Sequence, residues 1–97
     1  MSSAHTERTK DVEQITVDNV VFRRHGADWI AYRPGYVVKL FGQKRERNGS
    51  ATWHWVVYTH PVKGDAALVA ESRERAIAGK AARQALCAVD ADMSRED

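Results

Sequence analysis

The sequence predicts an α+β fold in which a small antiparallel sheet of four to five strands packs against one C-terminal helix. Two observations carry this prediction: an alternating segment over residues 36–60 that folds back at Asn48-Gly49, and an alanine-rich segment with helical periodicity that follows Ser72. A length of 97 residues indicates one domain. We expect a disordered segment over residues 1–14, a single α+β domain over 15–90 and a frayed acidic tail over 91–97.

The predicted strands are separated by residues that favour turns. Residues 1–14 are polar and lack periodicity, which is typical of disorder. Gly26 and the dipeptide Pro34-Gly35 favour turns between strands, and Pro61 and Gly64 close the long hairpin. The predicted strands are residues 20–24, 29–33, the two arms of 36–60 and a short edge strand at 66–70, with a short extended piece at 15–17.

The dipeptide Asn48-Gly49 predicts the register of the long hairpin. Asn-Gly favours a two-residue type I′ turn, so residues whose numbers add to 97 should lie opposite each other. One face of the hairpin then carries Leu40, Trp55 and Val57, and we expect this face to be the core, with the Trp55 indole lying over Gly42. Its predicted pairs are Leu40 with Val57, Gly42 with Trp55 and Lys44 with Trp53.

The opposite face of the hairpin combines aromatic and basic side chains. Such a mixture suits base stacking together with phosphate contact, and a two-stranded ribbon also fits the major groove of DNA. Alternatively, Phe41, Val56 and Tyr58 form a second small core under the N-terminal segment. The predicted pairs on this face are Lys39 with Tyr58, Phe41 with Val56, Gln43 with His54 and Arg45 with Thr52.

The C-terminal segment predicts a helix that begins after Ser72 and ends near Val89. Ser72 is a good N-cap residue, and apolar residues then recur about every four positions. Gly79 and the many alanines make a flat surface that suits close packing against the tryptophans of the sheet.

Charge and cysteine content limit the classes of function. The net charge is +2, but residues 15–65 carry eight basic and four acidic side chains, so a polyanionic partner is expected. Cys87 is the only cysteine, which excludes an internal disulfide and favours a reducing, cytoplasmic location, and we expect its thiol to be buried. Residues 1–14 lack the apolar core of a signal peptide, and we expect no membrane partner.

These features favour a protein that binds nucleic acid, DNA rather than RNA, through the outer face of its sheet. Its size is typical of small accessory proteins of mobile elements or phages. Arg73, Arg75, Lys80 and Arg83 either extend this surface or form the solvated side of the helix. The alternative function is a protein-binding or self-associating module, in which the basic surface serves an acidic protein, or a homodimer forms through Phe41, Val56 and Tyr58 or through an edge strand. The alternative interpretation of the basic turn at residues 44–47 is a solvated hairpin tip whose charges keep an edge soluble. The candidate binding residues are Lys39, Phe41, Lys44, Arg45, Arg47, His54 and Tyr58.

The segment WHWVVYTHPVKGDAALVAESRERAIAGKAARQAL resembles the closing half of AP2-type DNA-binding domains and, more loosely, integrase arm-binding domains. The resemblance lies in a tryptophan-bearing strand, a Pro-x-x-Gly turn at Pro61, a short strand and a helix opening Ser-x-Glu-x-Ala at Ser72. It implies a three-stranded sheet with a helix across it, and DNA contact through the exposed sheet face by Lys39, Arg45, His54 and Tyr58. The extra N-terminal strand and the position of the basic loop depart from that pattern.

No catalytic, cofactor or metal motif is expected. His54 and His60 are too far apart along one strand to share a metal ion, and Cys87 has no potential ligand at metal spacing. Ser72 lacks a glycine-flanked nucleophile motif, and the chain has no phosphate-cradling glycine loop. We therefore expect a binding protein that is not an enzyme.

Overall fold

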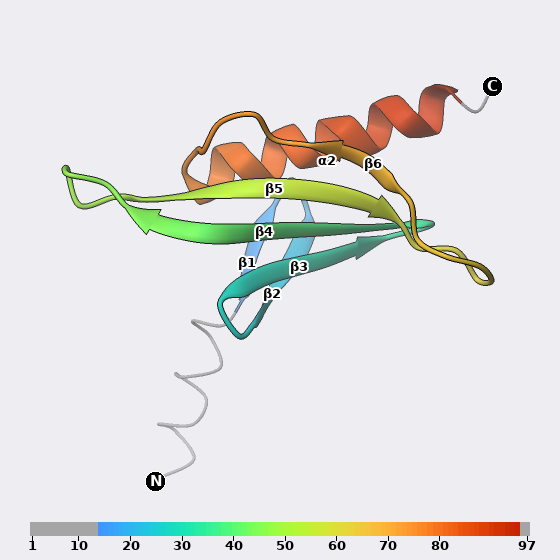
Figure 1. The fold of residues 1–97 in the computed structure, drawn as a ribbon, viewed down its shortest axis with the longest axis horizontal. Coiled ribbons are helices and arrows are strands. Elements are labelled where there is room, and N and C mark those ends of the chain that lie inside the picture. Colours follow the sequence, from blue (N-terminus) through green and yellow to red (C-terminus); the bar gives the residue numbers. More distant parts are fainter. Residues whose placement is uncertain (1–13, 96–97) are drawn as a thin grey trace, which may run out of the picture.

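The computed structural model describes residues 14–95, which form one antiparallel sheet of six strands with a helix against it (Figure 1). The predicted α+β class is confirmed, while the predicted number of strands is slightly too low. The difference is β1, which pairs along its whole length with β2. The elements are β1 (Gln14–Val17), β2 (Val20–His25), β3 (Asp28–Arg33), β4 (Tyr36–Arg45), β5 (Ala51–Thr59), β6 (Leu68–Glu71) and α2 (Ala78–Arg95).

The strands lie in the sheet in the order in which they occur in the chain, β1 to β6, and each pairs antiparallel with the next. The helix α2 contacts β4, β5 and β6 and also reaches β1 (Figure 1). Because strands at both edges of the sheet touch the same helix, the sheet curves around α2. The face toward α2, here called the inner face, is therefore concave, and the outer face is convex.

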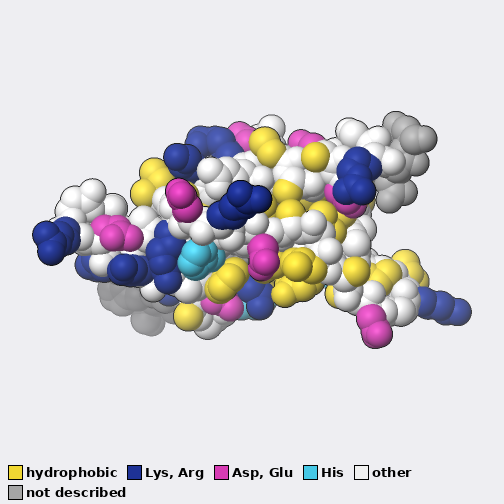
Figure 2. Space-filling model, turned by 45° about the horizontal axis from the view of Figure 1, so that its top comes forward, with side chains coloured by type: hydrophobic (Ala, Val, Ile, Leu, Met, Phe, Trp, Pro, Cys, Tyr) yellow, Lys and Arg dark blue, Asp and Glu magenta, His cyan; other side chains and the backbone are white. Residues whose placement is uncertain are grey.

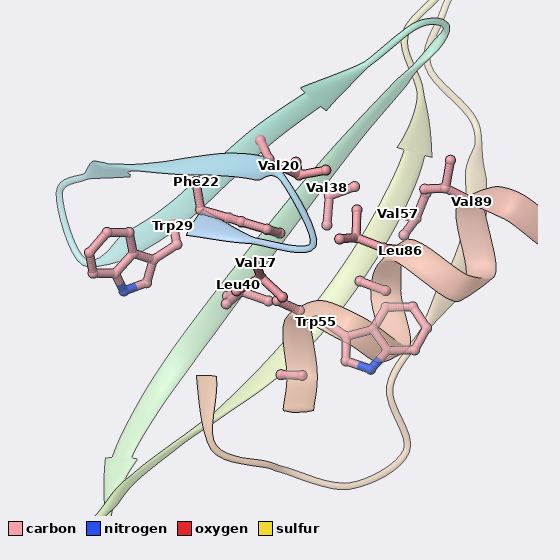
Figure 3. Packing of buried hydrophobic residues seen from close by; sticks show 14 of the residues in the cluster. Val17, Val20, Phe22, Trp29, Val38, Leu40, Trp55, Val57, Leu86 and Val89 are labelled. Atoms are coloured by element: carbon pink, nitrogen blue, oxygen red, sulfur yellow. The ribbon is translucent and has the colours of Figure 1, made fainter. Parts of the chain in front are cut away.

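The core lies between the inner face and α2, as the alternation predicts (Figure 3). Val38, Leu40 and Val57 are completely buried beneath the flat alanine surface of the helix. Two hydrogen bonds fix the helix along its length. The Trp55 indole Nε1–H donates to Gln84 Oε1 at 3.1 Å, and the Tyr36 hydroxyl donates to Asp92 Oδ2 at 2.7 Å. The core also includes Val17, Val20, Phe22, Trp29, Ala31, Trp53, Ala81, Ala82, Ala85, Leu86 and Val89.

The type I′ turn of the molecule occurs in the first hairpin. Asp18 and Asn19 have φ values of 51° and 68°, and Val17 pairs directly with Val20. Two consecutive residues with positive φ define a two-residue turn that matches the twist of its strands. Gln14, assigned to the disordered segment, is the first residue of β1, and the remainder of that segment, 1–13, lies outside the described residues.

The β4–β5 hairpin has a different turn from the one predicted. The Gly49 N–H donates to the Glu46 carbonyl at 3.0 Å, and the Glu46 N–H donates to the Ser50 carbonyl at 2.8 Å. Gly49 has a φ of 92°, so the loop contains three residues and ends in a left-handed glycine. The predicted two-residue turn is wrong because Asn-Gly also fits this second common hairpin loop.

A β-bulge at Gly42 shifts the hairpin register a second time. Gly42 has a φ of 68°, and the pairing changes between Phe41 and Lys44. Beyond the bulge Leu40 lies opposite Trp55, not Val57, and the predicted stacking of Trp55 on Gly42 is wrong. The loop and the bulge each shift the register by one residue in the same direction. A total shift of two residues leaves each side chain beyond the bulge on the face predicted for it. The core face of the main part of the hairpin is therefore as predicted.

The helix begins and ends later than predicted. Ser72 extends the pairing with β5: its N–H donates to the Trp55 carbonyl at 2.9 Å, and its Oγ accepts from the Trp55 N–H at 3.1 Å. The prediction that Ser72 caps the helix is therefore wrong, and Ile77 precedes α2. At the other end α2 continues past Val89 to Arg95. In this last part of the helix Asp92 accepts a hydrogen bond from the Tyr36 hydroxyl.

Two further properties of α2 concern its surface. Cys87 is exposed, so the predicted burial of its thiol is wrong: the residue lies on the solvent side of the helix, between buried Leu86 and Val89. Within residues 14–95, no helical segment combines the length and apolar character needed to cross a bilayer.

Candidate nucleic-acid interface

One end of the molecule, here called the basic end, combines the tip of the β4–β5 hairpin with the segment that leads into α2. It comprises residues 42–49 and 72–80, and it contains six Lys or Arg and two Glu side chains. The net charge of these residues is +4, whereas that of the whole chain is +2. Figure 2 shows Lys and Arg side chains at the projecting tip and on the surface next to it. The six basic residues are Lys44, Arg45, Arg47, Arg73, Arg75 and Lys80.

Backbone pairing holds the two segments of the basic end together. The Trp53 N–H donates to the Ala76 carbonyl at 2.7 Å, and the Ala76 N–H donates back to the Trp53 carbonyl at 3.0 Å. Arg75 Nη1 donates to the Gly42 carbonyl at the bulge. The left-handed conformation of Gly42 turns the chain here, so the bulge positions Arg75 over the hairpin.

A pair of stacked rings adjoins these cations on the outer face. Phe41 and His54 are paired across β4 and β5, and their ring centroids lie 5.8 Å apart with planes tilted by 31°. His54 Nδ1 lies 3.0 Å from Ser72 Oγ. This contact holds the His54 ring in place on the outer face.

The six basic side chains are exposed, and none of them forms an ion pair with another residue of the segment 14–95. Three of them, Arg73, Arg75 and Lys80, line a depression of about 250 Å³ beside the start of α2. Ile77 cannot cap this helix, so the first N–H groups of α2 add positive potential at the same place. Glu74 also lines the depression, so the side chains that line it carry a net charge of +2, which favours a phosphate group.

The structure separates the predicted site residues into two groups. Phe41, Lys44 and His54 share the outer face next to the bulge, and Arg47 lies exposed in the loop at the tip. Lys39 and Tyr58 lie farther along the outer face, where Lys39 Nζ is 4.0 Å from Asp28 Oδ2.

The bulge also exchanges the faces predicted for two cations. Lys44 pairs with Thr52 on the outer face, and Arg45 pairs with Ala51 on the inner-face side of the strand, the reverse of the predicted arrangement. Arg45 remains exposed at the tip and donates from Nη1 to the Gly49 carbonyl at 2.8 Å.

Of the four cations predicted to extend the surface from the helix, three belong to the basic end. Arg73 and Arg75 precede α2, Lys80 lies in its first turn, and Arg83 instead lies 3.9 Å from Asp18 at the β1–β2 turn. The roles of Gly42 and Ser72 at this site were not predicted. An isolated glycine in the interior of a predicted strand, as at Gly42, is the sequence signal that indicates a bulge.

Comparison with protein families, with curated proteins and with solved structures found no match to this chain.

Proposed function

We propose that the protein binds nucleic acid at its basic end. The observation that carries this proposal is the gathering of six exposed cations without ion-pair partners among residues 14–95, next to the stacked rings of Phe41 and His54. These cations can neutralise phosphates without first breaking an ion pair, and within the described part of the chain only Arg45 and Arg75 of the six also donate to backbone carbonyls. The partly exposed rings of Phe41 and His54 suit base or sugar contact. Lys39 has a smaller role in this proposal because Asp28 already lies beside it.

The shape of the basic end favours duplex DNA. The tip of the β4–β5 hairpin projects beyond the rest of the sheet (Figure 1), and it carries Lys44, Arg45 and Arg47. The major groove of B-DNA is about 12 Å wide and admits a two-stranded ribbon. In this arrangement the tip enters the groove while Arg73, Arg75 and Lys80 contact the phosphates at its edge.

Fluorescence anisotropy with duplex DNA, single-stranded DNA and RNA at two salt concentrations tests the proposal. If about four phosphates are neutralised, the logarithm of the association constant for duplex DNA falls with the logarithm of salt at a slope of roughly −3 to −4. The double variant Arg45→Ala/Arg47→Ala should weaken binding and reduce the slope by about 2.

A charge-matched control lies at the opposite end of the molecule. Lys63 is exposed in the loop after β5, and Arg95 is the last described residue of α2, so Lys63→Ala/Arg95→Ala removes the same charge far from the basic end. We expect this variant to bind nearly as tightly as the unchanged protein. Equal losses in the two variants would show that only net charge matters, and no binding to any of the three polymers at low salt would refute the proposal.

A further inference from the structure

We propose that the protein forms a two-fold symmetric homodimer through the outer face of its sheet, with the symmetry axis parallel to β4. The inference does not depend on nucleic-acid binding, because it concerns the part of the outer face beyond the basic end. The occupant of this surface is a second copy of the chain, and the argument rests on how the charges and the apolar side chains are arranged across the strands.

The outer face carries an apolar row across β3 to β6. Strand pairing places Tyr32 next to Val37, Val37 next to Tyr58 and Tyr58 next to Leu68. Tyr32, Tyr58 and Leu68 have exposed fractions of 60%, 36% and 53%. Large apolar side chains that adjoin one another on a sheet face are typical of an interface.

The neighbouring row has opposite charges at its two ends. Across β2 to β6 it reads Arg23, Ile30, Lys39, Val56 and Glu71. Arg23 and Glu71 are both exposed, and neither forms an ion pair with another described residue of the chain.

A two-fold axis parallel to β4 makes each row of one copy complementary to the same row of the second copy. It places each row opposite the same row in reverse order, so Arg23 of one copy faces Glu71 of the other, twice in each dimer. In the apolar row the same operation places Tyr32 opposite Tyr58 and Val37 opposite Val37. Face-to-face sheets pack with their strands nearly aligned, which this axis allows.

The alternative axis, perpendicular to the strands, opposes like charges. It places Arg23 opposite Arg23 and Glu71 opposite Glu71, which is unfavourable. Lys39 lies near the axis in either arrangement, and its ammonium group lies toward Asp28 of its own chain at 4.0 Å. The arrangement of charges therefore selects the axis parallel to β4.

The shape of the face supports the same pairing. Val56, although it lies on the outer face, is only 6% exposed and lines a depression of about 280 Å³ between Phe41 and Tyr58. The charged side chains of Asp28, Lys39 and Glu71 also line this depression. With the axis parallel to β4, Val56 faces Ile30 of the second copy, a partly exposed side chain on the opposite side of β4. Ile30 of each copy thus fills the depression of the other.

The size of the contact indicates a weak dimer. Five strands spaced at about 4.8 Å and the two rows of side chains, about 6.8 Å apart along each strand, give a footprint of roughly 330 Å² per copy, or about 650 Å² in total. This is below the roughly 1,000 Å² of a stable specific interface, and the convex face adds no further contact, so we expect a transient dimer that forms only at high protein concentration. Since the axis is parallel to β4, both basic ends lie at the same end of the dimer.

Sedimentation velocity up to about 1 mM protein, without nucleic acid, tests the proposal. Tyr32→Asp changes an exposed residue and should abolish the dimer without unfolding the chain, which circular dichroism checks. Arg23→Glu and Glu71→Arg should each raise the dissociation constant several-fold, and the double variant should return it to within about twofold of the original. Lys39→Met removes a like-charge contact near the axis and should strengthen the dimer.

Restoration by the charge exchange supports both the face and the axis, since pairing through the β6 edge, which contains Glu71, does not bring Arg23 of β2 next to it. A monomer at all concentrations would overturn the proposal, and so would a dimer that Tyr32→Asp leaves intact. A dimer that is lost in Tyr32→Asp but not restored by the charge exchange would overturn the symmetry axis and hence the proposal as stated.

Discussion

Replacing Gly42 by alanine distinguishes the bulged hairpin from a regular one. In a regular strand alanine stabilises by about 0.5–1 kcal/mol relative to glycine. At the observed φ of 68° a Cβ atom is unfavourable, and we expect Gly42→Ala to destabilise the protein by about 1–2 kcal/mol. The added methyl group would lie 3.7 Å from His54 Cδ2 and 3.8 Å from Arg75 Nη1, which are ordinary contacts, so the cost comes from the backbone alone.

Gly79→Ala is the matched control for this prediction. Gly79 lies in the first turn of α2 without a positive φ, and its added Cβ would lie 3.8 Å from Arg83 Nη1. This variant should stabilise the protein by up to about 1 kcal/mol. Urea unfolding monitored by tryptophan fluorescence measures both changes, and each kcal/mol should shift the melting temperature by about 4–8 °C. A neutral or stabilising Gly42→Ala would refute the bulge and the register that depends on it.

Three further predictions test burial and polar contacts. Val57→Ala, at a fully buried position, should cost about 2 kcal/mol or more, whereas the same change at Val62, which is fully exposed, should cost less than about 0.5 kcal/mol by urea unfolding. Ser72→Ala leaves the Trp55 N–H without its side-chain partner and should cost about 1–3 kcal/mol, whereas Ser72→Thr keeps the hydroxyl and should cost less. The Cys87 thiol is exposed, so a thiol reagent should modify it in the folded protein at a rate close to that in urea; protection in the folded state would contradict its placement.

The faces of the long hairpin could be predicted from the sequence, whereas its register could not. Alternation alone assigns Val38, Leu40, Trp55 and Val57 to one buried face, because this assignment needs only a period of two. The register depends on the loop type at Asn48-Gly49 and on the conformation of Gly42. Gly49 is compatible with a two-residue or a three-residue loop, and Gly42 with a regular strand or a bulge. The two errors have the same direction, so the core face was correct while the faces of Lys44 and Arg45 were exchanged.

The start of the helix was mispredicted because the Ser72 hydroxyl can either cap a helix or form hydrogen bonds to a neighbouring strand. A serine before an alanine-rich segment is a good cap, yet here the hydroxyl contacts Trp55 and His54 of the neighbouring strand. The choice depends on the tertiary pairing of residues 72–76 with β5, which local propensity does not contain. For the same reason the sequence could name Arg73 and Arg75 as candidates but could not place them beside the tip of the hairpin.

The order of the strands has a consequence for how the chain folds during synthesis. Every strand pairs with its neighbour in the sequence, so the sheet can assemble one hairpin at a time as the chain emerges. The helix that covers Val38, Leu40 and Val57 is synthesised after all six strands. Until α2 emerges, a nearly complete sheet exposes its apolar inner face and two unpaired edges, which is the kind of intermediate that chaperones bind and that aggregates in their absence. A chain stalled before residue 78 should therefore be captured by chaperones far more strongly than the complete one.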